Sequence, residues 1–468
     1  MRLSSYIILT LMASMTSLNM SATIEITPGQ LEEELNKSEI QEDLVISGNA
    51  DIRDLVSLKS LPSTVKSLDL QKLKINSYDS RTPAYLGKTF FKGDRLPAYI
   101  FFRSECNNIR IPDGINIIEA GAFAASDIEE IIIPEGVTEI DEFAFYDCKN
   151  LRYVTLPSTL TKIGKGAFAN CPRLCEINLE STKVTRIPEK CFEGDSALEN
   201  LELYQITEIG SQAFSSTALT TLYLPSVSRL DAYALAGMSF LSELTMNADA
   251  EFNEGVLMNN GNLVQVSGIP ADVPALFAAN CVSYVPADAI GRASSIGNFA
   301  FSNSAISEIV LGRALTTVGK NILHGSDRIS HIDATALGNY VPATEDEAFD
   351  SLDTSKIRLL VNDDSYDTWA SHPVWGRFDV YTSTITGIEN EGIADNAGIT
   401  ITIADGYVNI SGKENLEIVR ICDASGAILL TLKPDATTAT VALESLPSGI
   451  VIINAKSGME NKSVKLII

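Results

Sequence analysis

A pattern of apolar and polar positions recurs about every 22 residues through the middle of the chain. Each unit has an apolar stretch of the form L-x-x-I-x-L-P, a turn, an isoleucine, and then a small residue followed by a bulky apolar one. The pattern is plainest in residues 128–150, 151–173 and 306–328. Because a unit this short cannot close a hydrophobic core alone, the pattern predicts stacked units that share one core.

The bulky apolar residue, called the marker below, can be followed through twelve units. We number these units as coils one to twelve by their markers, which are Phe101, Phe123, Phe145, Phe168, Phe192, Phe214, Leu235, Leu257, Phe277, Phe301, Leu323 and Phe349. The register is weakest between Met246 and Ser295, where Leu257 and Phe277 are assigned. The spacing predicts a mainly β solenoid of about twelve coils of about 22 residues, with parallel strands about 4.8 Å apart.

The segments before the repeats have a different character. Residues 1–22 are typical of a secretory signal peptide, because Arg2 precedes the apolar run Tyr6–Leu11 and small residues end at Ser21-Ala22. The alternative is a buried N-terminal strand. Residues 23–95 are then the N-terminal cap, and residues 96–381 are the solenoid with its closing segment. No other stretch approaches the roughly 18 consecutive apolar residues of a membrane span.

The repeat ends in a segment of small and polar residues, 382–398, which we assign as a linker. From residue 399 to 468, short β-rich runs alternate with turns such as Asp405-Gly406 and Ser411-Gly412. Seven such runs in this length predict a small antiparallel β-sandwich.

The repeat resembles a known family at this point. The sequence LPSTLTKIGKGAFANCPRL at Leu156–Leu174 is similar to the repeat of the BspA-like leucine-rich repeat proteins of Bacteroidetes and related anaerobes. DIRDLVSL at Asp51–Leu58 resembles the cap of that family, and Ile357–Tyr381 resembles its closing segment. The resemblance implies a leucine-rich repeat solenoid that is secreted or on the cell surface, and that binds host or microbial macromolecules as an adhesin does.

The tail resembles the C-terminal sorting domain of the type IX secretion system. The similar pieces are DASGAIL at Asp423–Leu429, LPSGIVIINAKSG at Leu446–Gly458 and the closing SVKLII. The usual Pro-Asn-Pro opening and the common basic end are absent. The resemblance implies that residues 399–468 engage secretion or surface-attachment machinery. The alternative is a passive sandwich that serves as a cap or spacer.

Composition narrows the chemistry. The chain has 35 Lys and Arg against 60 Asp and Glu, a net charge of −25, which argues against a nucleic-acid partner. Three histidines and no recognised catalytic or phosphate-binding motif predict no enzyme, no cofactor and no metal site. Cys148 and Cys171 each lie three residues after a marker, and Cys191 takes the small-residue position, so we interpret them as buried thiols.

The outward positions of the strands are the candidate binding site. Side chains alternate along a strand, so the residues between the apolar positions form columns across neighbouring coils. We predict that a concave face binds ligand through Tyr153, Glu176, Asn200, Glu202, Tyr204, Thr221, Tyr223 and Glu243. Tyr offers a large contact area, and Asn, Thr and Glu offer adaptable hydrogen bonds, which suits a protein or glycan ligand. Two alternatives remain, a glycan-processing enzyme or accessory that uses carboxylates as acid and base, and a structural spacer without a ligand.

Overall fold

The computed structural model describes residues 21–467 except 248, 383–398, 405–406, 424–427, 447–449 and 458–459. Nearly all of the predicted signal peptide and linker therefore lies outside the described residues. The chain forms two compact units, which are described separately. One is Met1–Ile332 with Tyr340–Ile357, and the other is Asp333–Asn339 with Arg358–Ile468.

A small α/β cap begins the first unit. Its elements are β1 (Ala22–Ile26), α2 (Leu31–Lys37), β2 (Asp43–Ala50), α3 (Ile52–Ser57), η1 (Leu58–Ser60), β3 (Ser67–Asp69), β4 (Leu73–Ile75), β5 (Tyr78–Asp79) and β6 (Phe90–Phe91). Helix α3 starts with a capping box. The Asp51 carboxylate accepts the Arg53 backbone N–H, and the Asp54 carboxylate accepts the Asp51 backbone N–H. Strands β1, β2 and β3 are parallel and continue directly into the sheet of the repeats. The sheet edge of the first coil is thus covered by the cap.

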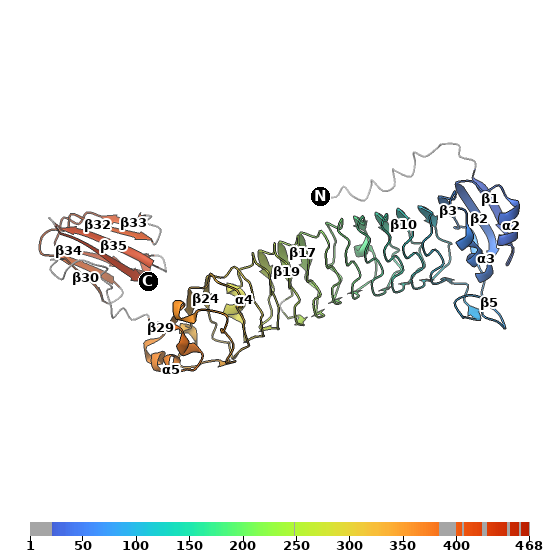
Figure 1. The fold of residues 1–468 in the computed structure, drawn as a ribbon. Helices are drawn as coiled ribbons and strands as arrows, with labels where there is room; N and C mark the ends of the chain where they lie inside the picture. The colour runs from blue at the N-terminus through green and yellow to red at the C-terminus, as the bar shows by residue number, and fades with distance from the viewer. Residues whose placement is uncertain are drawn as a thin grey trace. The chain divides into compact units, whose positions relative to one another are not determined.

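In nine of the first eleven coils, the chain runs from a short strand, through a turn that holds the marker, to a second strand, which we call the long strand (Figure 1). The short strands are β7 (Arg95–Leu96), β9 (Ile117–Ile118), β11 (Glu139–Ile140), β13 (Lys162–Ile163), β15 (Arg186–Ile187), β16 (Glu208–Ile209), β18 (Arg229–Leu230), β20 (Glu251–Phe252), β22 (Asp272–Val273), β23 (Ser295–Ile296), β25 (Thr317–Val318) and β27 (Ala343–Thr344). The long strands are β8 (Asn108–Arg110), β10 (Glu130–Ile132), β12 (Tyr153–Thr155), β14 (Glu176–Ile177), β17 (Thr221–Leu224), β19 (Glu243–Met246), β21 (Gln265–Ser267), β24 (Glu308–Val310) and β26 (His331–Asp333). The pairs recorded for these strands, such as β10 with β12 and β17 with β19, are parallel, as predicted.

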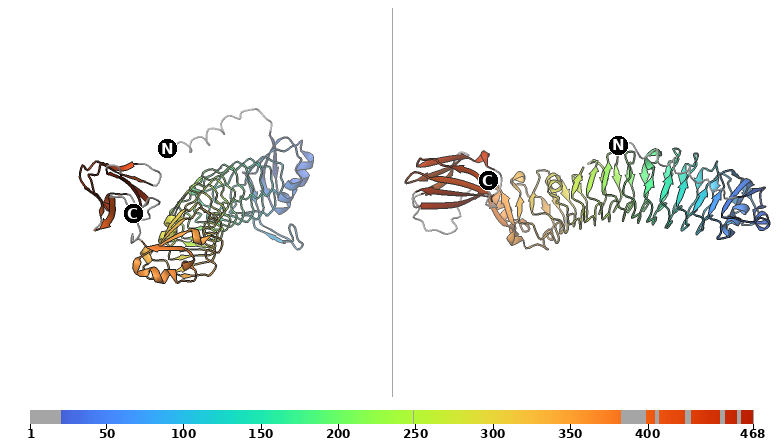
Figure 2. Two further views of the ribbon diagram at one scale, coloured as in Figure 1. Left: turned by 60° about the vertical axis from the view of Figure 1, so that its left-hand side comes forward. Right: turned by 90° about the horizontal axis from the view of Figure 1, so that it is seen from above.

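The markers form the core of the solenoid, and all twelve are buried. The rings of the first six, Phe101 to Phe214, stack face to face with centroids 5.0–5.8 Å apart. Burying each ring contributes about 2 kcal/mol relative to exposure. The stack places one aromatic layer in each of coils one to six, and the coils of the array follow one another in chain order (Figures 1 and 2).

The turn around the marker is built from two left-handed residues. In coils one to eleven, the residues two before and two after the marker position all have φ between +48° and +85°. Glycine and asparagine tolerate this conformation, and they recur there. At the earlier position an aromatic ring often covers a glycine of the next coil. A Cβ on Gly166 would lie 2.6 Å from the Phe143 ring, and one on Gly121 would lie 2.3 Å from the Tyr99 ring.

Coil nine corrects one assigned marker. Its left-handed residues are Leu276 and Asn280, which are centred on Ala278 rather than on Phe277. The backbone agrees, because Ala278 donates to the Ala300 carbonyl just as Phe145 donates to that of Ala167. The Phe277 side chain is still fully buried, but its ring meets that of Phe301 edge to face instead of stacking. The sequence assignment at this coil is therefore wrong by one residue.

Two coils lack a long strand. In coil five, residues 201–203 form no strand, and the long-strand sheet stops at β14. In coil nine, helix α4 (Ala287–Arg292) follows the turn where a long strand would lie, and β21 is the last strand of its sheet. The long-strand surface is therefore divided into separate short sheets along the solenoid.

The second unit contains the predicted closing segment and the tail. Its first part comprises β28 (Arg358–Val361), α5 (Tyr366–Ala370) and β29 (Asp379–Thr382). Trp369 and Trp375 are buried against each other there, and the indole N–H of Trp369 donates to the Gly338 carbonyl at 2.8 Å. Because this division places the segment outside the first unit, its role as a cover for the last coil stays a prediction.

The tail folds into two antiparallel sheets with a shared apolar core, as the alternating pattern predicted. Their orders are β30-β31-β34 and β33-β32-β35-β36. The strands are β30 (Ile399–Ala404), β31 (Tyr407–Gly412), β32 (Ile418–Asp423), β33 (Ile428–Leu432), β34 (Thr438–Ala442), β35 (Ile450–Ser457) and β36 (Glu460–Ile467). Ile401, Val408, Val419 and Ile453 are among the buried core residues.

Candidate ligand-binding face

The long strands hold their outward side chains in columns, because neighbouring strands pair in register. Glu130 lies opposite Tyr153, and Tyr153 lies opposite Glu176. Farther along, Thr221 lies opposite Glu243, and Tyr223 lies opposite Thr245. The apolar residues between them, such as Val154 and Leu222, point into the core and are buried. The alternation thus gives each of these sheets an outward surface, and we call these surfaces together the long-strand face.

All eight residues predicted for binding are exposed, and the structure brings two of the tyrosines together. Tyr204 and Tyr223 are each 53% exposed, and their rings meet edge to face with centroids 5.8 Å apart. Tyr153 lies in another sheet, where the Arg152 guanidinium stacks over its ring at 5.3 Å. Exposed aromatic pairs present apolar area with little side-chain freedom to lose on binding.

The carboxylates of this face are not neutralised by the solenoid. Glu176, Glu202 and Glu243 are exposed, and none of them forms an ion pair with any residue in the part of the chain that the structure describes. Coil five contributes Asn200 and Glu202 without a strand, so their direction is set by an irregular segment. The surface around the tyrosine pair is therefore acidic and polar.

Sequence reasoning missed some members of the face and misplaced one. Gln265 and Ser267 of β21 extend the columns of Glu243 and Thr245, but they lie in the stretch where the repeat register was weak. The half-buried Asn178 lies two residues after Glu176, where strand alternation predicts that its side chain points outward. Its amide instead accepts from the Leu156 backbone N–H at 2.6 Å and donates to the Leu156 carbonyl at 3.1 Å.

The short strands present a different surface, the short-strand face, on which charges alternate. Arg186, Glu208, Arg229 and Glu251 lie opposite one another in register on β15, β16, β18 and β20. The Arg186–Glu208 and Arg229–Glu251 pairs measure 3.5 and 3.4 Å. Many acidic side chains of this face are therefore paired with basic ones in the next coil.

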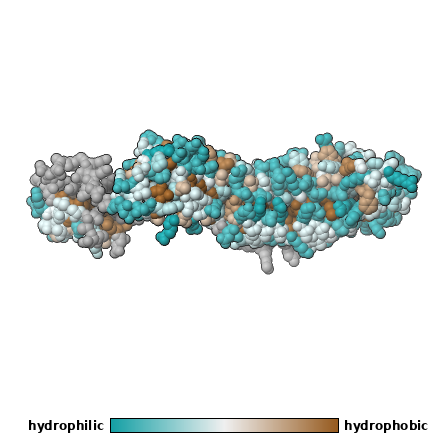
Figure 3. Space-filling view, turned by 90° about the horizontal axis from the view of Figure 1, so that it is seen from below, coloured by the Kyte–Doolittle hydropathy of each residue, from teal (hydrophilic) through white to brown (hydrophobic). Residues whose placement is uncertain are grey.

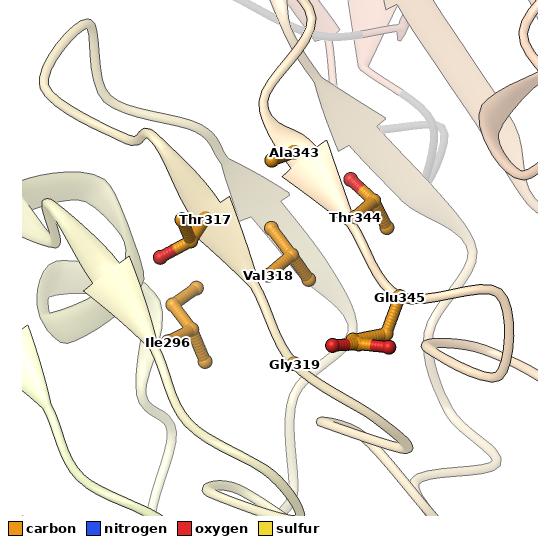
Figure 4. A pocket seen from close by; sticks show the side chains of 7 residues that line it. All are labelled: Ile296, Thr317, Val318, Gly319, Ala343, Thr344 and Glu345. Atoms are coloured by element: carbon orange, nitrogen blue, oxygen red, sulfur yellow. The ribbon is translucent and has the colours of Figure 1, made fainter.

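One of two surface hollows lies over the short strands near the end of the array. The larger hollow, of about 360 Å³, lies over β23, β25 and β27, where Thr317, Thr344 and Glu345 are its only hydroxyl or charged side chains (Figure 4). One carboxylate without a second acid or base does not make a hydrolytic pair. All seven cysteines are free, and burial raises the pKa of the Cys171 and Cys191 thiols. Cys148, Cys171 and Cys191 are buried, as interpreted from the sequence.

The described ranges contain neither a cluster of metal-ligating side chains nor a helix that could span a membrane. No group of three or more His, Cys, Asp or Glu side chains there is placed to hold a metal ion. Among those same residues, none of the helices has the length and apolar character that crossing a bilayer requires. Seen from below the view of Figure 1, the surface of the repeats is mostly hydrophilic, with apolar residues in scattered spots (Figure 3).

With this geometry established, comparison with known proteins identifies the repeats. The family described as "BspA type Leucine rich repeat region (6 copies)" matches residues 94–216, 176–273 and 279–367, which together make up more than half of the chain. The chain belongs to this family. The match of the BspA-type repeats is interrupted between residues 273 and 279, in the coil whose marker is displaced.

One solved structure of a leucine-rich repeat protein supports the fold, and two others are similar at lower TM-scores. A leucine-rich repeat protein from Bacteroides ovatus is 19% identical, with a TM-score of 0.54, and the match covers 77% of this chain and 92% of that one. The pneumococcal vaccine antigen PcpA is 17% identical, with 68% and 85% covered and a TM-score of 0.37. A leucine-rich repeat protein of T. pallidum is 24% identical, with 36% and 82% covered and a TM-score of 0.33. No curated protein matches the chain.

The tail has its own match. Residues 404–468 match the family described as "Secretion system C-terminal sorting domain". Together with the BspA-type repeats, this tail indicates an exported cell-surface protein that uses secretion machinery. The predicted N-terminal signal peptide stays a prediction.

Proposed function

We propose that this protein is a non-enzymatic cell-surface binding protein whose BspA-type solenoid holds a macromolecular ligand, a protein or a glycan, on its long-strand face. The observation that carries the proposal is the exposed Tyr204–Tyr223 pair, on a face whose carboxylates Glu202 and Glu243 form no ion pair with any described residue. Aromatic rings supply contact area, and the surrounding Glu, Asn and Thr side chains supply hydrogen bonds.

The negative charge of the long-strand face restricts the classes of ligand that it favours. Glu176, Glu202 and Glu243 repel an anionic partner, and they favour a cationic or neutral one. A neutral polysaccharide would stack on the tyrosine rings, whereas a basic protein surface would also pair with the carboxylates. The salt dependence of binding separates these two, because only the second weakens strongly as ionic strength rises.

The test is a binding array of extracellular-matrix proteins and polysaccharides, probed with the full chain. A triple variant, Tyr153→Ala with Tyr204→Ala and Tyr223→Ala, is expected to weaken binding at least tenfold, which corresponds to about 1.4 kcal/mol. Tyr340→Ala is the matched control, because Tyr340 is similarly exposed but precedes the short strand β27 instead of belonging to the long-strand face. The control is expected to bind like the unaltered chain.

Three outcomes contradict the proposal. Unchanged binding by the triple variant places the ligand on another surface. Release of new polysaccharide ends during incubation identifies an enzyme instead. A blank array with both proteins and glycans favours a spacer without a ligand.

A further inference from the structure

One interior row of the solenoid contains mostly polar side chains, with Met238 as an apolar member in coil seven. It lies three residues after the marker position, where the chain leaves the turn. Its buried polar members are Ser126, Cys148, Cys171, Asp195, Thr217, Asn260, Cys281, Ser304 and Ser326. Buried polar groups need hydrogen-bond partners, so each member of this row must be satisfied inside the protein.

Five members of the row make an equivalent hydrogen bond, each in its own coil. Each donates from its side chain to the backbone carbonyl of the marker in the preceding coil. The pairs are Cys148 to Phe123 (3.1 Å), Cys171 to Phe145 (3.1 Å), Asn260 to Leu235 (2.9 Å), Cys281 to Leu257 (3.0 Å) and Ser326 to Phe301 (3.3 Å). The row therefore requires a donor at each of these positions.

Asp195, in coil five, lacks a donor when it is ionised. Its Oδ1 accepts the Cys171 backbone N–H at 2.8 Å, while its Oδ2 is buried without a partner. The acceptor that the row assigns to it is the carbonyl of Phe168, the preceding marker. Among the hydrogen bonds of the described residues, none is donated to that carbonyl.

Asn260 shows how the same position is satisfied by an isosteric side chain. Its Oδ1 accepts the Met238 backbone N–H at 2.7 Å, and its Nδ2 donates to the Leu235 carbonyl at 2.9 Å. The Oδ1 bond of Asp195 reproduces the first of these contacts. The second requires a hydrogen on Oδ2.

We infer that Asp195 is a neutral carboxylic acid in the folded protein, and that its Oδ2–H donates to the Phe168 carbonyl oxygen. A carboxylate there would instead place a buried negative charge against an unsatisfied carbonyl, without any compensating donor. The proton thus completes the interior row at coil five, where a cysteine, serine or asparagine completes it elsewhere.

The surroundings favour the protonated form. The titratable groups that face Asp195 are the thiols of Cys148, Cys171 and Cys191, which come from coils three, four and five. Within the described residues, no Lys, Arg or His forms an ion pair with Asp195. Burial raises the pKa of Asp195 well above its ordinary value.

The sign of the pH effect follows from this direction. Because the folded-state pKa of Asp195 lies above its unfolded value, its stabilising contribution is complete below about pH 4 and is lost as pH rises through the folded-state pKa. Asp195 therefore stabilises coil five most at acidic pH. It is also the coil that carries Asn200, Glu202 and Tyr204, but the inference about the proton does not depend on any ligand.

Asp195→Asn is the direct test, carried out on the full chain. The variant supplies the donor permanently, as Asn260 does. Its folding equilibrium constant relative to that of the unaltered chain should rise by up to about tenfold per pH unit above about pH 4, until the folded-state pKa is passed. Asp113→Asn, which removes an exposed carboxylate of the same array, should follow the unaltered chain in parallel. A gap for Asp195→Asn that stays constant between pH 4 and pH 8 would overturn the inference.

Two further measurements remain decisive if thermal unfolding is irreversible. The infrared spectrum of the unaltered chain near pH 6 should contain the carbonyl stretch of a protonated carboxylic acid, which Asp195→Asn removes; its absence overturns the inference. Hydrogen exchange at pH 8 should show better protected amides in residues 186–208 of Asp195→Asn than of the unaltered chain, and equal protection counts against it. Asp195→Ser, which supplies a hydroxyl donor as Ser326 does, replaces the variant if Asp195→Asn fails to fold.

Discussion

The two strand faces of the solenoid both carry glutamates, but these glutamates are paired with arginines on one face and unpaired among the described residues on the other. On the short-strand face, Glu208 lies between Arg186 and Arg229, so its charge is neutralised by the neighbouring coils. On the long-strand face, Glu243 lies between Thr221 and Gln265, and no cation of the described chain reaches it. Net charge alone therefore does not mark a binding surface. The useful quantity is the charge that the fold itself leaves unpaired.

The difference also separates stability from recognition. Exposed ion pairs contribute little individually, but an alternating ladder fixes which strands can lie in register. Tyr204 and Tyr223 contribute to neither the ladder nor the core, because half of each side chain remains exposed. We therefore expect substitutions on the short-strand face to change stability, and those on the long-strand face to change binding.

The largest effect should come from the core that both faces share. Phe145→Ala removes a fully buried ring from the middle of the stack and leaves a cavity, so it should lower the free energy of unfolding by about 3–5 kcal/mol. Denaturant unfolding measures the change. Phe240→Ala, which truncates a ring that is 57% exposed, is the control and should cost no more than about 0.5 kcal/mol. Equal costs for the two would mean that the stack does not hold the faces together.

A smaller loss should follow from Gly166→Ala in the turn. The new methyl group would lie 2.6 Å from the Phe143 ring, at φ +58°, so we expect a loss of about 1–3 kcal/mol. Gly114→Ala separates the two causes, because Gly114 has φ +85° but open space around it. Adding Phe143→Ala should restore part of the loss in Gly166→Ala. Thermal unfolding of these three variants tests this order, and a loss in Gly114→Ala as large as that in Gly166→Ala would contradict the role of the ring.

The smallest effect compares the faces directly. Glu208→Lys places three cations in a row and should cost about 1 kcal/mol at low salt, less as salt is added. Glu243→Lys has no cationic neighbour and should change stability by less than about 0.5 kcal/mol. It should nevertheless alter ligand binding on the array. The comparison fails if the two reversals change the unfolding midpoint and its salt dependence alike.

Most of the fold could be predicted from the repeat, because the same apolar positions must be buried against the neighbouring units in every coil. The marker positions predict the buried core, because all twelve assigned residues are buried. In ten of the first eleven coils the left-handed residues also flank the assigned marker. Coil nine failed because Phe277 is the bulkier residue, whereas the backbone places Ala278 at the turn. The sequence Ala-Asn-Cys occurs at 169–171 and again at 279–281, and aligning these two segments gives the correct register for coil nine. With it, Cys281 joins the interior row of Cys148 and Cys171.

The candidate site was less accessible to sequence reasoning. Strand alternation correctly predicted that Tyr153, Tyr204 and Tyr223 are exposed, but not which of them touch. Asn178 followed the outward pattern and still turned back onto Leu156, because an amide can satisfy both groups of a backbone where a strand ends. Nor does composition distinguish a carboxylate paired across coils from an unpaired one. That distinction needs the register between strands.

The alternation of aromatic and glycine residues at the turn has a consequence for how such an array can change length. Tyr99 covers Gly121, and Phe143 covers Gly166, so in coils one to four the true repeating block is two coils long. Deleting coil two alone would bring Tyr99 against Phe143, two rings where the space admits one. Removing coils two and three together would bring Tyr99 over Gly166 and preserve the pairing. In this part of the molecule, growth and shrinkage of the solenoid should therefore proceed by even numbers of coils.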